Sequence, residues 1–419
     1  WGGEVMPLTY LLPLEYSQFI EAFTAGEMRK KEAKSGGGGD GTGVDGQTSG
    51  DAPPPLNYWI MKPVGLSRGR GIRLLQDLGD LTYNTTCVVQ KYVEQPLCIN
   101  NYKFDLRLYI VVLSFTPLEV YIYTDGFARI STVAYSTDPQ SAQNKFIHLT
   151  NSSIQKHNTQ SGNVYETIKG GVVGADAGGS GGGGRRRSSS TNPLSKHRKD
   201  RIDEDEELGD IDGDCDGDDE EHKEGGSKIA LLGVHGLWHM LQDLPAPPEQ
   251  TARHGKNIST TVLWEDICTL VLKSLLTLND KISSQPNCFE LFGYDVIIDS
   301  NLRPWLLEVN ASPSLSRDNP LDFKVKNSLI KDIVALLDLL PYNREHLVKI
   351  LQRRVQNKSF LTRNDPWLEA DLRAILGNRV PRKYGELPRN MGLFQRLAPN
   401  MDKYEKLLKI KKKMFKSIT

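Results

Sequence analysis

Two short apolar segments that flank a polar turn constrain the fold of this chain more than any other feature of its sequence. Residues 294–298 and 305–309 are rich in Val, Ile, Leu and Trp, and residues 299–301 between them read Asp-Ser-Asn. Apolar runs of this length beside turn-forming residues are typical of a β-hairpin. We therefore expect an antiparallel pair of strands at this place in the chain.

Three polar side chains lie at the open end of this hairpin. Successive side chains of a strand point to opposite faces, so Glu308 and Asn310 share one face. Pairing the strands around the turn places Asp295 opposite about Leu306 and on that same face. Carboxylate and amide oxygens suit Mg²⁺, which also binds phosphates. The hairpin therefore predicts a magnesium site at Asp295, Glu308 and Asn310, and the alternative is a polar patch at a strand end.

A glycine-rich segment follows a predicted strand at residues 58–61. Residues 62–72 read Lys-Pro-Val-Gly-Leu-Ser-Arg-Gly-Arg-Gly-Ile, without the Gly-Lys-Ser/Thr of a Walker loop. Glycine lets backbone N–H groups approach phosphate oxygens, and a lysine at a strand end can neutralise phosphate charge. We expect Lys62, Arg68 and Gly69 to contact a nucleotide phosphate. An ordinary glycine-rich turn is the alternative.

A second strand, at residues 87–92, ends in polar side chains. Gln90, Lys91, Tyr92 and Val93 stand where a hinge that reads adenine would be placed. The same four residues also suit an ordinary strand end, and the segment alone does not decide between the two interpretations.

Charged residues alternate with apolar ones where the next strand begins. Lys103, Asp105 and Arg107 occupy alternate positions, so one face of an apolar strand is charged. Buried charges need partners, which phosphate and ribose hydroxyls would supply. Arg129, late in a later strand, has the planar guanidinium that suits a carboxylate-bearing substrate. A salt-bridged surface strand and a structural arginine–carboxylate pair are the alternatives.

Residues 148–153 form a dense polar run that reads His-Leu-Thr-Asn-Ser-Ser. Thr150, Asn151 and Ser153 can bind nucleotide and substrate. They can equally cap a helix, because Ser, Thr and Asn are favoured at helix N-termini.

The remaining pattern indicates an α+β enzyme, because strands and helices are mixed along the chain. Residues 106–115 favour a strand, and Asp125-Gly126 predicts a hairpin turn between strands at residues 120–123 and 127–132. Helical spacing of apolar residues predicts two helices. These helices are expected at residues 260–281 and at residues 327–340, where Pro341 stops the second.

Two low-complexity stretches interrupt the ordered sequence. Their composition cannot bury enough apolar surface to offset the entropy of ordering, so we interpret them as flexible insertions within one catalytic unit. The expected parts are a partial N-terminal subdomain (1–34), a flexible insertion (35–55), a central catalytic part (56–169), a disordered insertion (170–227), a C-terminal catalytic part with the hairpin (228–340) and a basic helical extension (341–419).

Bulk composition excludes several classes of protein. Lys plus Arg equals Asp plus Glu at 52 each, and no nucleic-acid-binding motif is present, so no nucleic-acid partner is expected. Five cysteines without metal-ligand spacing argue for a reducing compartment. No apolar run approaches the ~20 residues of a membrane span, so no membrane partner is expected. The chain begins at Trp1 without a signal-like segment, so we expect either a fragment or a truncated gene model, and its N-terminus supports no prediction of targeting.

The C-terminal run at residues 403–416 holds seven lysines and one acid, Glu405, at amphipathic spacing. Such a run is either a solvated helix face or a patch that attracts acidic chains.

Taken together, these segments resemble the tubulin–tyrosine-ligase-like proteins. The resemblance covers about residues 5–160 and 228–340, in the order of that family. The motifs that carry it are Trp59-Ile-Met-Lys-Pro63, Gln90-Lys-Tyr92, Lys103-Phe-Asp-Leu-Arg107, Gly126-Phe-Ala-Arg129, His148-Leu-Thr-Asn151, Phe292-Gly-Tyr-Asp295 and Trp305-Leu-Leu-Glu-Val-Asn-Ala-Ser-Pro313.

The resemblance implies an ATP-grasp fold, in which two α+β halves clamp Mg-ATP. It implies that Asp295, Glu308 and Asn310 hold Mg²⁺ and that Arg107 stabilises the reacting phosphoryl or acyl-phosphate group. Arg129 and Ser153 would grip the incoming amino acid. The implied nucleotide contacts are Lys62, Gln90, Lys91, Tyr92, Lys103, Asp105, Thr150 and Asn151.

The implied reaction joins a free amino acid to the acidic tails of tubulin in two steps. ATP phosphorylates a tail carboxylate, and the amino group of the free amino acid attacks the acyl phosphate. Lys62-Pro63 resembles the glutamylases, so glutamate is the expected amino acid, with microtubules, the cytoplasm and a cilium or flagellum basal body as the expected setting. Glutamylases usually carry Lys just before a Trp where this chain has Leu237-Trp238. A glycylase, a tyrosine ligase and a weakly catalytic microtubule adaptor therefore remain as alternatives.

Overall fold

The computed structural model describes residues 2–35, 56–66, 69–81, 85–158, 231–283, 285, 288–356 and 367–416. Apart from Ser35, the insertion expected at residues 35–55 lies outside these ranges, and so does the insertion expected at residues 170–227. Arg68, a predicted phosphate contact, also lies outside the described residues. No helix within the described ranges is both long and apolar enough to cross a membrane.

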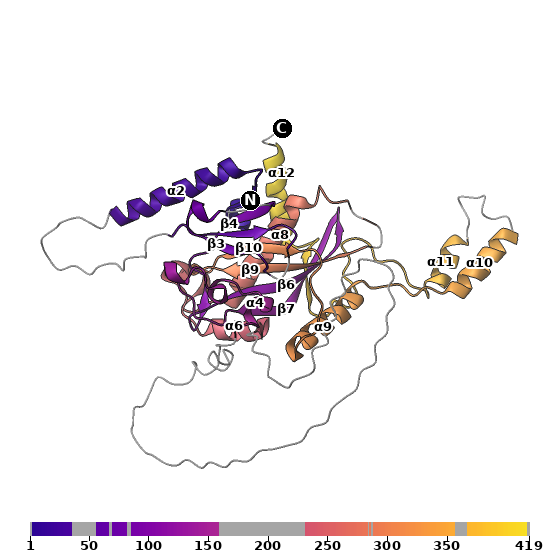
Figure 1. The fold of residues 1–419 in the computed structure, drawn as a ribbon. Coiled ribbons are helices and arrows are strands. Elements are labelled where there is room, and N and C mark those ends of the chain that lie inside the picture. The colour runs from indigo at the N-terminus through magenta and orange to yellow at the C-terminus, as the bar shows by residue number, and fades with distance from the viewer. Residues whose placement is uncertain are drawn as a thin grey trace, which may run out of the picture. The chain divides into compact units, whose positions relative to one another are not determined.

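A large antiparallel sheet forms the scaffold of the described chain (Figure 1). Its main strands follow the order β10-β9-β6-β7-β11, with β5 paired to β6 and β8 paired to β7. They are β5 (Cys98–Ile99), β6 (Tyr102–Phe115), β7 (Leu118–Ile130), β8 (Leu231–Gly233), β9 (Glu290–Ile298), β10 (Pro304–Asn310) and β11 (Phe394–Ala398). Antiparallel strands combined with helices confirm the expected α+β class.

A second antiparallel sheet has the order β1-β4-β2-β3. Its strands are β1 (Thr9–Leu12), β2 (Trp59–Pro63), β3 (Arg73–Leu75) and β4 (Cys87–Lys91). The strands expected at residues 58–61 and 87–92 are therefore confirmed to within a residue or two.

The helices of the described chain vary in length from 4 residues, as in α1, to 20 residues in α2. They are α1 (Gly2–Val5), α2 (Tyr16–Ser35), α3 (Lys145–His148), α4 (Ser152–Gln155), α6 (Val234–Gln242), α7 (Thr251–His254), α8 (Thr260–Leu278), α9 (Pro320–Leu336), α10 (Arg344–Gln356), α11 (Leu368–Ile375) and α12 (Asp402–Lys416). Short 3₁₀ turns lie at Leu78–Asp80, Pro139–Ser141 and Pro248–Gln250.

The two faces of β6 belong to two different apolar layers. Leu106, Leu108 and Ile110 pack in a core shared with α6, α8 and α12, whereas Tyr109 and Val111 pack in a core shared with α9. Each large buried apolar side chain contributes about 1.5–3 kcal/mol by leaving water. Because side chains alternate along a strand, Lys103, Asp105 and Arg107 lie on the same face of β6 as Tyr109 and Val111, which pack against α9.

The smaller sheet also has two distinct faces. Trp59 and Met61 pack on Phe19 and Phe23 of α2, while Ile60 belongs to a cluster on the opposite face of β2. Because side chains of a strand alternate, Lys62 shares the face of Ile60 and is directed away from α2.

The hairpin turn expected at Asp125-Gly126 is wrong. β7 runs unbroken through both residues, and its pairing with β6 shifts register between Leu108 and Ile110. A Cβ at Gly126 would overlap the carbonyl oxygen of Arg107. The glycine therefore permits a close approach of two backbones at a strand irregularity, and does not mark the end of a strand.

The helix boundaries follow local capping signals. α8 starts after Ser259, whose side chain accepts a hydrogen bond from the N–H of Val262, in agreement with the prediction. α9 begins seven residues earlier than expected, because Asn319 caps it and Pro320 occupies its first position. β11 adds a strand within the extension expected to be helical, where it pairs with β7.

Candidate active site

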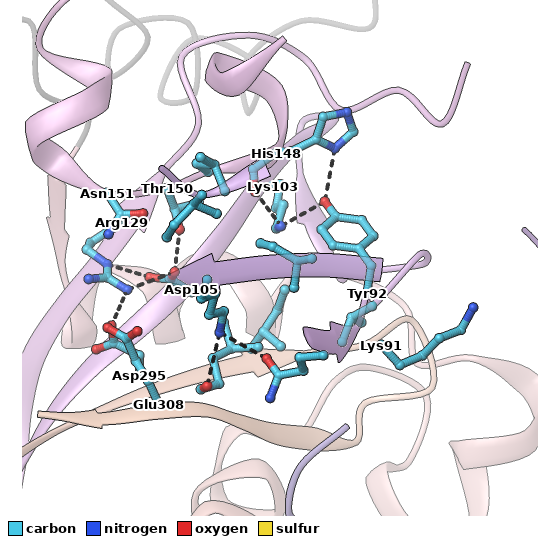
Figure 2. Close-up of a pocket in the computed structure, with 18 residues that line it drawn as sticks. Lys91, Tyr92, Lys103, Asp105, Arg129, His148, Thr150, Asn151, Asp295 and Glu308 are labelled. Atoms are coloured by element: carbon cyan, nitrogen blue, oxygen red, sulfur yellow. Dashed lines mark hydrogen bonds and ion pairs between the residues drawn. The ribbon is translucent and has the colours of Figure 1, made fainter. Parts of the chain in front are cut away.

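A cavity of about 580 Å³, including its open mouth, lies between the two sheets. The smaller sheet and the segment after β4 line one side, the large sheet another, and the polar run after α3 closes it (Figure 2). The predicted site residues that line the cavity are Lys62, Gln90, Lys91, Tyr92, Val93, Lys103, Asp105, Arg129, Thr150, Asn151, Asp295 and Glu308. These residues, which were selected from the sequence, therefore lie around a single cavity.

Asp295 is the centre of the charged network in this cavity. The carboxylate is almost fully buried and accepts hydrogen bonds from Arg107 Nε, from Arg107 Nη2 at 3.0 Å and from Arg129 Nη2 at 2.8 Å. Burial alone would raise the pKa of Asp295, but the charges of Arg129 and Arg107 outweigh it and hold that pKa well below its usual range. Asp295 is therefore ionised at neutral pH.

Glu308 lies directly opposite Asp295, and the predicted pairing with Leu306 is wrong. The register shifts between Leu306 and Glu308, so Leu306 pairs with Val296 and Glu308 with Asp295. The extra residue turns Leu306 to the opposite face and leaves Glu308 beside Asp295. Burial, the neighbouring charge of Asp295 and a hydrogen bond between the two side chains raise the pKa of Glu308.

Asn310 completes the trio expected from the hairpin. Its Nδ2 lies 3.3 Å from Glu308 Oε1 and 3.3 Å from the carbonyl oxygen of Gly293. The three expected metal ligands are thus brought together, with two carboxylates and one amide in a row across β9 and β10. Within the described ranges, no group of three or more His, Cys, Asp or Glu side chains has the arrangement of a metal site.

The donor chemistry of this trio fits Mg²⁺. Hard oxygen donors suit that ion, which commonly takes only one or two protein carboxylates and fills its shell with phosphate oxygens and water. Glu308 faces Asp295 across the two strands, and the charge of Asp295 adds to the larger effect of burial in raising the pKa of Glu308, so two negative charges lie close together here. A cation between them would relieve that crowding.

Arg129 forms an arginine–carboxylate pair with Asp105. Its Nε donates to Asp105 Oδ1 at 2.6 Å and its Nη2 donates to Asp105 Oδ2 at 2.9 Å, while Thr150 Oγ1 donates to the same carboxylate. This is the structural pair that the sequence left open as an alternative. Because Arg129 also contacts Asp295, one guanidinium joins β6, β7 and β9.

Lys62 enters the cavity from the smaller sheet. Its Nζ donates to Gln90 Oε1 at 3.0 Å and to the carbonyl oxygen of Leu307 at 3.3 Å. Burial lowers the pKa of Lys62, and the carboxylates of Glu308 and Asp295 oppose that effect. The ammonium of Lys62 therefore joins the two sheets at Leu307, where the pairing of β10 with β9 shifts register.

Lys103 and Tyr92 form a chain of hydrogen bonds with His148. Lys103 Nζ donates to Tyr92 Oη at 2.9 Å and to the carbonyl oxygen of His148 at 2.7 Å. Tyr92 Oη lies 3.0 Å from His148 Nδ1, and His148 Nε2 lies 3.2 Å from the carbonyl oxygen of Ser141. This pattern assigns the imidazole proton to Nε2, so that Nδ1 accepts from the phenol. Burial lowers the pKa of Lys103 to about 8.

The pKa of His148 is lowered to about 4, first by burial and then by the charge of Lys103. The unfolded chain binds a proton near the ordinary pKa of about 6.5, so between these values the unfolded state holds more protons than the folded state. The free energy of unfolding should therefore fall as the pH drops from about 6.5 to about 4. His148→Gln removes this titrating group. The slope of the unfolding free energy against pH should therefore decrease by an amount equivalent to at most one bound proton.

Urea unfolding of both proteins, in half-unit steps from pH 7.5 to 4, measures this effect. The difference in unfolding free energy should be constant above about pH 7 and change only within the window of the imidazole. A difference that stays constant down to pH 4 would contradict the depressed pKa of His148.

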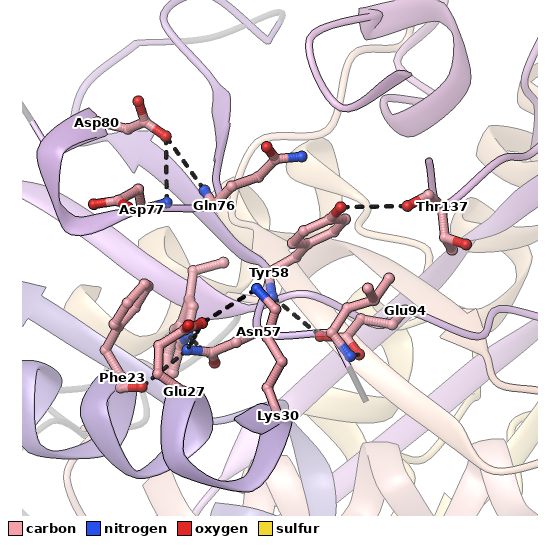
Figure 3. Close-up of polar contacts among 12 residues, drawn as sticks. Phe23, Glu27, Lys30, Asn57, Tyr58, Gln76, Asp77, Asp80, Glu94 and Thr137 are labelled. Atoms are coloured by element: carbon pink, nitrogen blue, oxygen red, sulfur yellow. Dashed lines mark hydrogen bonds and ion pairs between the residues drawn. The ribbon is translucent and has the colours of Figure 1, made fainter. Parts of the chain in front are cut away.

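Lys91 lies at the cavity wall, but its ammonium is turned away from the charged network (Figure 2). Its Nζ donates to Glu94 Oε1 at 2.9 Å, to Asn57 Oδ1 at 3.1 Å and to the carbonyl oxygen of Leu56 at 3.3 Å. Asn57 in turn donates to the carbonyl oxygen of Phe23 at 2.9 Å (Figure 3). In this conformation the side chain of Lys91 joins β4 to the network that holds α2.

Gly69 and Ser153 lie beside the cavity instead of inside it. Both line a neighbouring surface cavity, together with Ile154. Gly69 has a φ of +75°, and a Cβ there would approach the side chain of Ile154 and come within 3.5 Å of Asn151 Cγ. The glycine-rich segment therefore packs closely on the start of α4, which only a residue without a Cβ permits.

Apolar residues complete the cavity, and the sequence analysis did not select them. They are Ile60, Ile72, Leu149, Ile297 and Leu307. Alternation could have identified Ile60 from Lys62 and Ile297 from Asp295, because each pair shares a strand face. Leu307 could not be found in this way, since its place depends on the shift in register.

Leu237 is fully buried in the core under α6. Its neighbour Trp238 packs edge-on against Trp264, with ring centroids 6.3 Å apart. The side chain of Leu237 is therefore directed into the apolar core and does not line the cavity.

Comparison with known proteins adds an independent line of observation. The sequence profile of the tubulin-tyrosine ligase family matches residues 2–172 and 247–347. The probable tubulin polyglutamylase TTLL2 of Homo sapiens is 32% identical over 337 residues, which cover 80% of this chain and 41% of that protein. The tubulin polyglutamylase TTLL5 of Homo sapiens is 30% identical over 341 residues, which cover 80% of this chain and 19% of that protein. The tubulin monoglutamylase TTLL4 of Mus musculus is 29% identical over 299 residues, or 69% of this chain and 19% of its own length. This chain therefore spans less than half the length of each of these relatives.

Proposed function

Because this chain belongs to the tubulin–tyrosine ligase family, we propose that it is an ATP-dependent ligase that adds glutamate to glutamate side chains of tubulin tails. Proteins that resemble it over 80% of its length are named tubulin polyglutamylases. The observation that carries the proposal is the facing pair Asp295 and Glu308, which lies between cations from both sheets.

The proposed nucleotide site is the cavity between the two sheets, as in an ATP-grasp fold. Lys62 and Lys103 supply positive charge for phosphate oxygens. The apolar side chains of Ile60, Ile297 and Leu307 supply a surface for the flat adenine ring. Asp105 and the backbone around Tyr92 are the proposed partners of ribose and base.

Asp295, Glu308 and Asn310 are the proposed ligands of Mg²⁺. When bound, the ion would neutralise phosphate charge. Arg107 is already hydrogen-bonded to Asp295, so its guanidinium stands where it can stabilise charge that develops on the reacting group. Arg129 and Ser153 remain the proposed contacts of the incoming amino acid.

The proposed chemistry proceeds through an acyl phosphate. The tail carboxylate attacks the γ-phosphorus of ATP and ADP leaves; the amino group of free glutamate then attacks the acyl carbon, forms the amide and releases phosphate. No residue of the chain becomes covalently modified, so catalysis rests on position and charge. A tubulin substrate would place the protein at the cytoskeleton.

Incubation with microtubules, ATP and one radiolabelled amino acid at a time tests this proposal. The expected result is ATP-dependent incorporation of glutamate into tubulin tails, with little glycine or tyrosine. Incorporation of glycine or tyrosine alone would replace the proposed substrate. Binding to microtubules without incorporation of any amino acid would favour an adaptor over an enzyme.

A further inference from the structure

Lys103 is almost fully enclosed where it lines the cavity proposed for the nucleotide. An ammonium has three N–H donors, and two of those on Lys103 are committed: one to Tyr92 Oη at 2.9 Å and one to the carbonyl oxygen of His148 at 2.7 Å. The three N–H bonds diverge from one nitrogen, so two fixed acceptors also fix the direction of the third. That third donor makes no hydrogen bond within the described part of the chain and is available to a ligand.

The phenol of Tyr92 is oriented by the imidazole of His148. The carbonyl oxygen of Ser141 lies 3.2 Å from His148 Nε2 and can only accept a hydrogen bond, so Nε2 carries the proton of the neutral ring. His148 Nδ1 is then an acceptor, and Tyr92 Oη, 3.0 Å away, donates to it. This arrangement leaves the lone pairs of the phenol oxygen for the ammonium of Lys103.

The imidazole of His148 is held in one orientation by its surroundings. The residue is 4% exposed, and the rings of Tyr92 and Tyr135 pack edge-on against it, with centroids 5.6 and 5.9 Å away. His148 ends α3, Tyr92 follows β4 and Lys103 lies in β6. The chain of hydrogen bonds therefore joins three separate elements (Figure 2). A rotation of the imidazole would break its hydrogen bonds at both ring nitrogens.

We infer that His148 is a positioning residue for the nucleotide: it orients the phenol of Tyr92, and the phenol oxygen directs the ammonium of Lys103 to a phosphate oxygen of ATP. The inference rests on the proposed ligase function, which places a nucleotide in this cavity. The neutral imidazole brings no charge of its own to the phosphates, so its effect passes through Tyr92 and Lys103. The alternative role is structural, in which His148 only fills the space between two tyrosine rings.

The test compares His148→Asn with His148→Gln. The shorter amide of Asn can place its oxygen near the position of Nδ1 and accept from Tyr92, whereas the amide of Gln reaches the position of Nε2 and keeps only the contact with Ser141. His148→Gln should raise the KM for ATP about tenfold, the scale of one hydrogen bond to a charged group, with kcat within about twofold. His148→Asn should stay within about threefold of the wild type. A structural role predicts the reverse order, because Asn fills less of the space.

A double-mutant cycle shows whether His148 acts through Lys103. Lys103→Met should weaken ATP binding, and adding His148→Gln to it should cause no further loss. Effects of the two substitutions that multiply would overturn the inference. Tyr92→Phe should match His148→Gln. Tyr58→Phe is the control, because Tyr58 is a buried tyrosine of the same apolar cluster whose hydroxyl donates to the carbonyl oxygen of Thr137 at 3.3 Å, and it should leave the KM for ATP unchanged.

A binding measurement distinguishes failure of this inference from failure of the ligase proposal. Calorimetric titration of the full chain with Mg-ATP, without tubulin or free amino acid, should give a Kd about tenfold higher for His148→Gln than for the wild type. Equal affinities would refute the positioning role even if the wild type ligates glutamate. Weaker binding by His148→Gln, together with a wild type that incorporates no amino acid, would refute only the ligase proposal. A wild type that binds no Mg-ATP would refute both.

Discussion

Glu308→Gln is expected to lower kcat for ligation by about 10²–10³-fold, which is the usual cost of removing one preorganised electrostatic group. The substitution keeps the shape of the side chain and removes its charge at the point where β10 faces Asp295. A neutral amide oxygen binds a divalent cation more weakly than a carboxylate does, and it cannot neutralise the charge of the cation. Steady-state rates of glutamate incorporation at saturating ATP measure the loss.

The same substitution should leave the fold intact or make it slightly more stable. Burial and the charge of Asp295 raise the pKa of Glu308, so its ionised form is disfavoured in the folded protein at neutral pH. A neutral amide at this position would remove that cost, and urea unfolding should show an unchanged or higher free energy. Glu290→Gln, at the exposed start of β9, is the matched control and should change neither quantity. Near-normal turnover by Glu308→Gln would refute the proposed metal site.

Arg129→Met is expected to destabilise the fold by about 3–5 kcal/mol, because it leaves two buried carboxylates without a shared partner. Asp105 loses both hydrogen bonds from the guanidinium, and Asp295 loses the one at 2.8 Å. Arg129→Lys keeps the charge but not the planar fork, so its loss should be smaller. The midpoint and slope of urea unfolding give both values.

Arg373→Met provides the comparison for this loss. Arg373 pairs with Glu369 on α11 at 2.7 Å, and both side chains are more than half exposed. An exposed pair of this kind contributes at most about 1 kcal/mol, so its removal should have little effect. If the two methionine variants lose similar stability, the buried network does not hold the sheet together.

The alternation of residues along β6 allowed much of the site to be predicted. Lys103 and Asp105 share a face because a strand has a period of two, and they line one cavity for that reason. The hairpin was also predicted, since apolar runs and turn residues are local signals. Local patterns of this kind depend only on neighbours in sequence.

The features that were missed depend on contacts between distant segments. The register shift before Glu308 lies where the carbonyl of Leu307 accepts a hydrogen bond from Lys62, 245 residues earlier in the chain. Gly126 resembles a turn residue in sequence, but its role is set by the backbone of Arg107 on the next strand. The ammonium of Lys91 is held by Asn57 and Glu94, a preference that no spacing along one strand reveals.

The shared face of β6 has a consequence for how this protein can be altered. Asp105, a proposed contact of the nucleotide, and Arg107, a proposed contact of the reacting group, share a face of β6 with Tyr109 and Val111, which pack against α9. One strand, β6, thus carries both proposed site residues and the apolar side chains that pack against α9. A substitution that loosens the packing of this face of β6 on α9 is therefore expected to displace Asp105 and Arg107 as well.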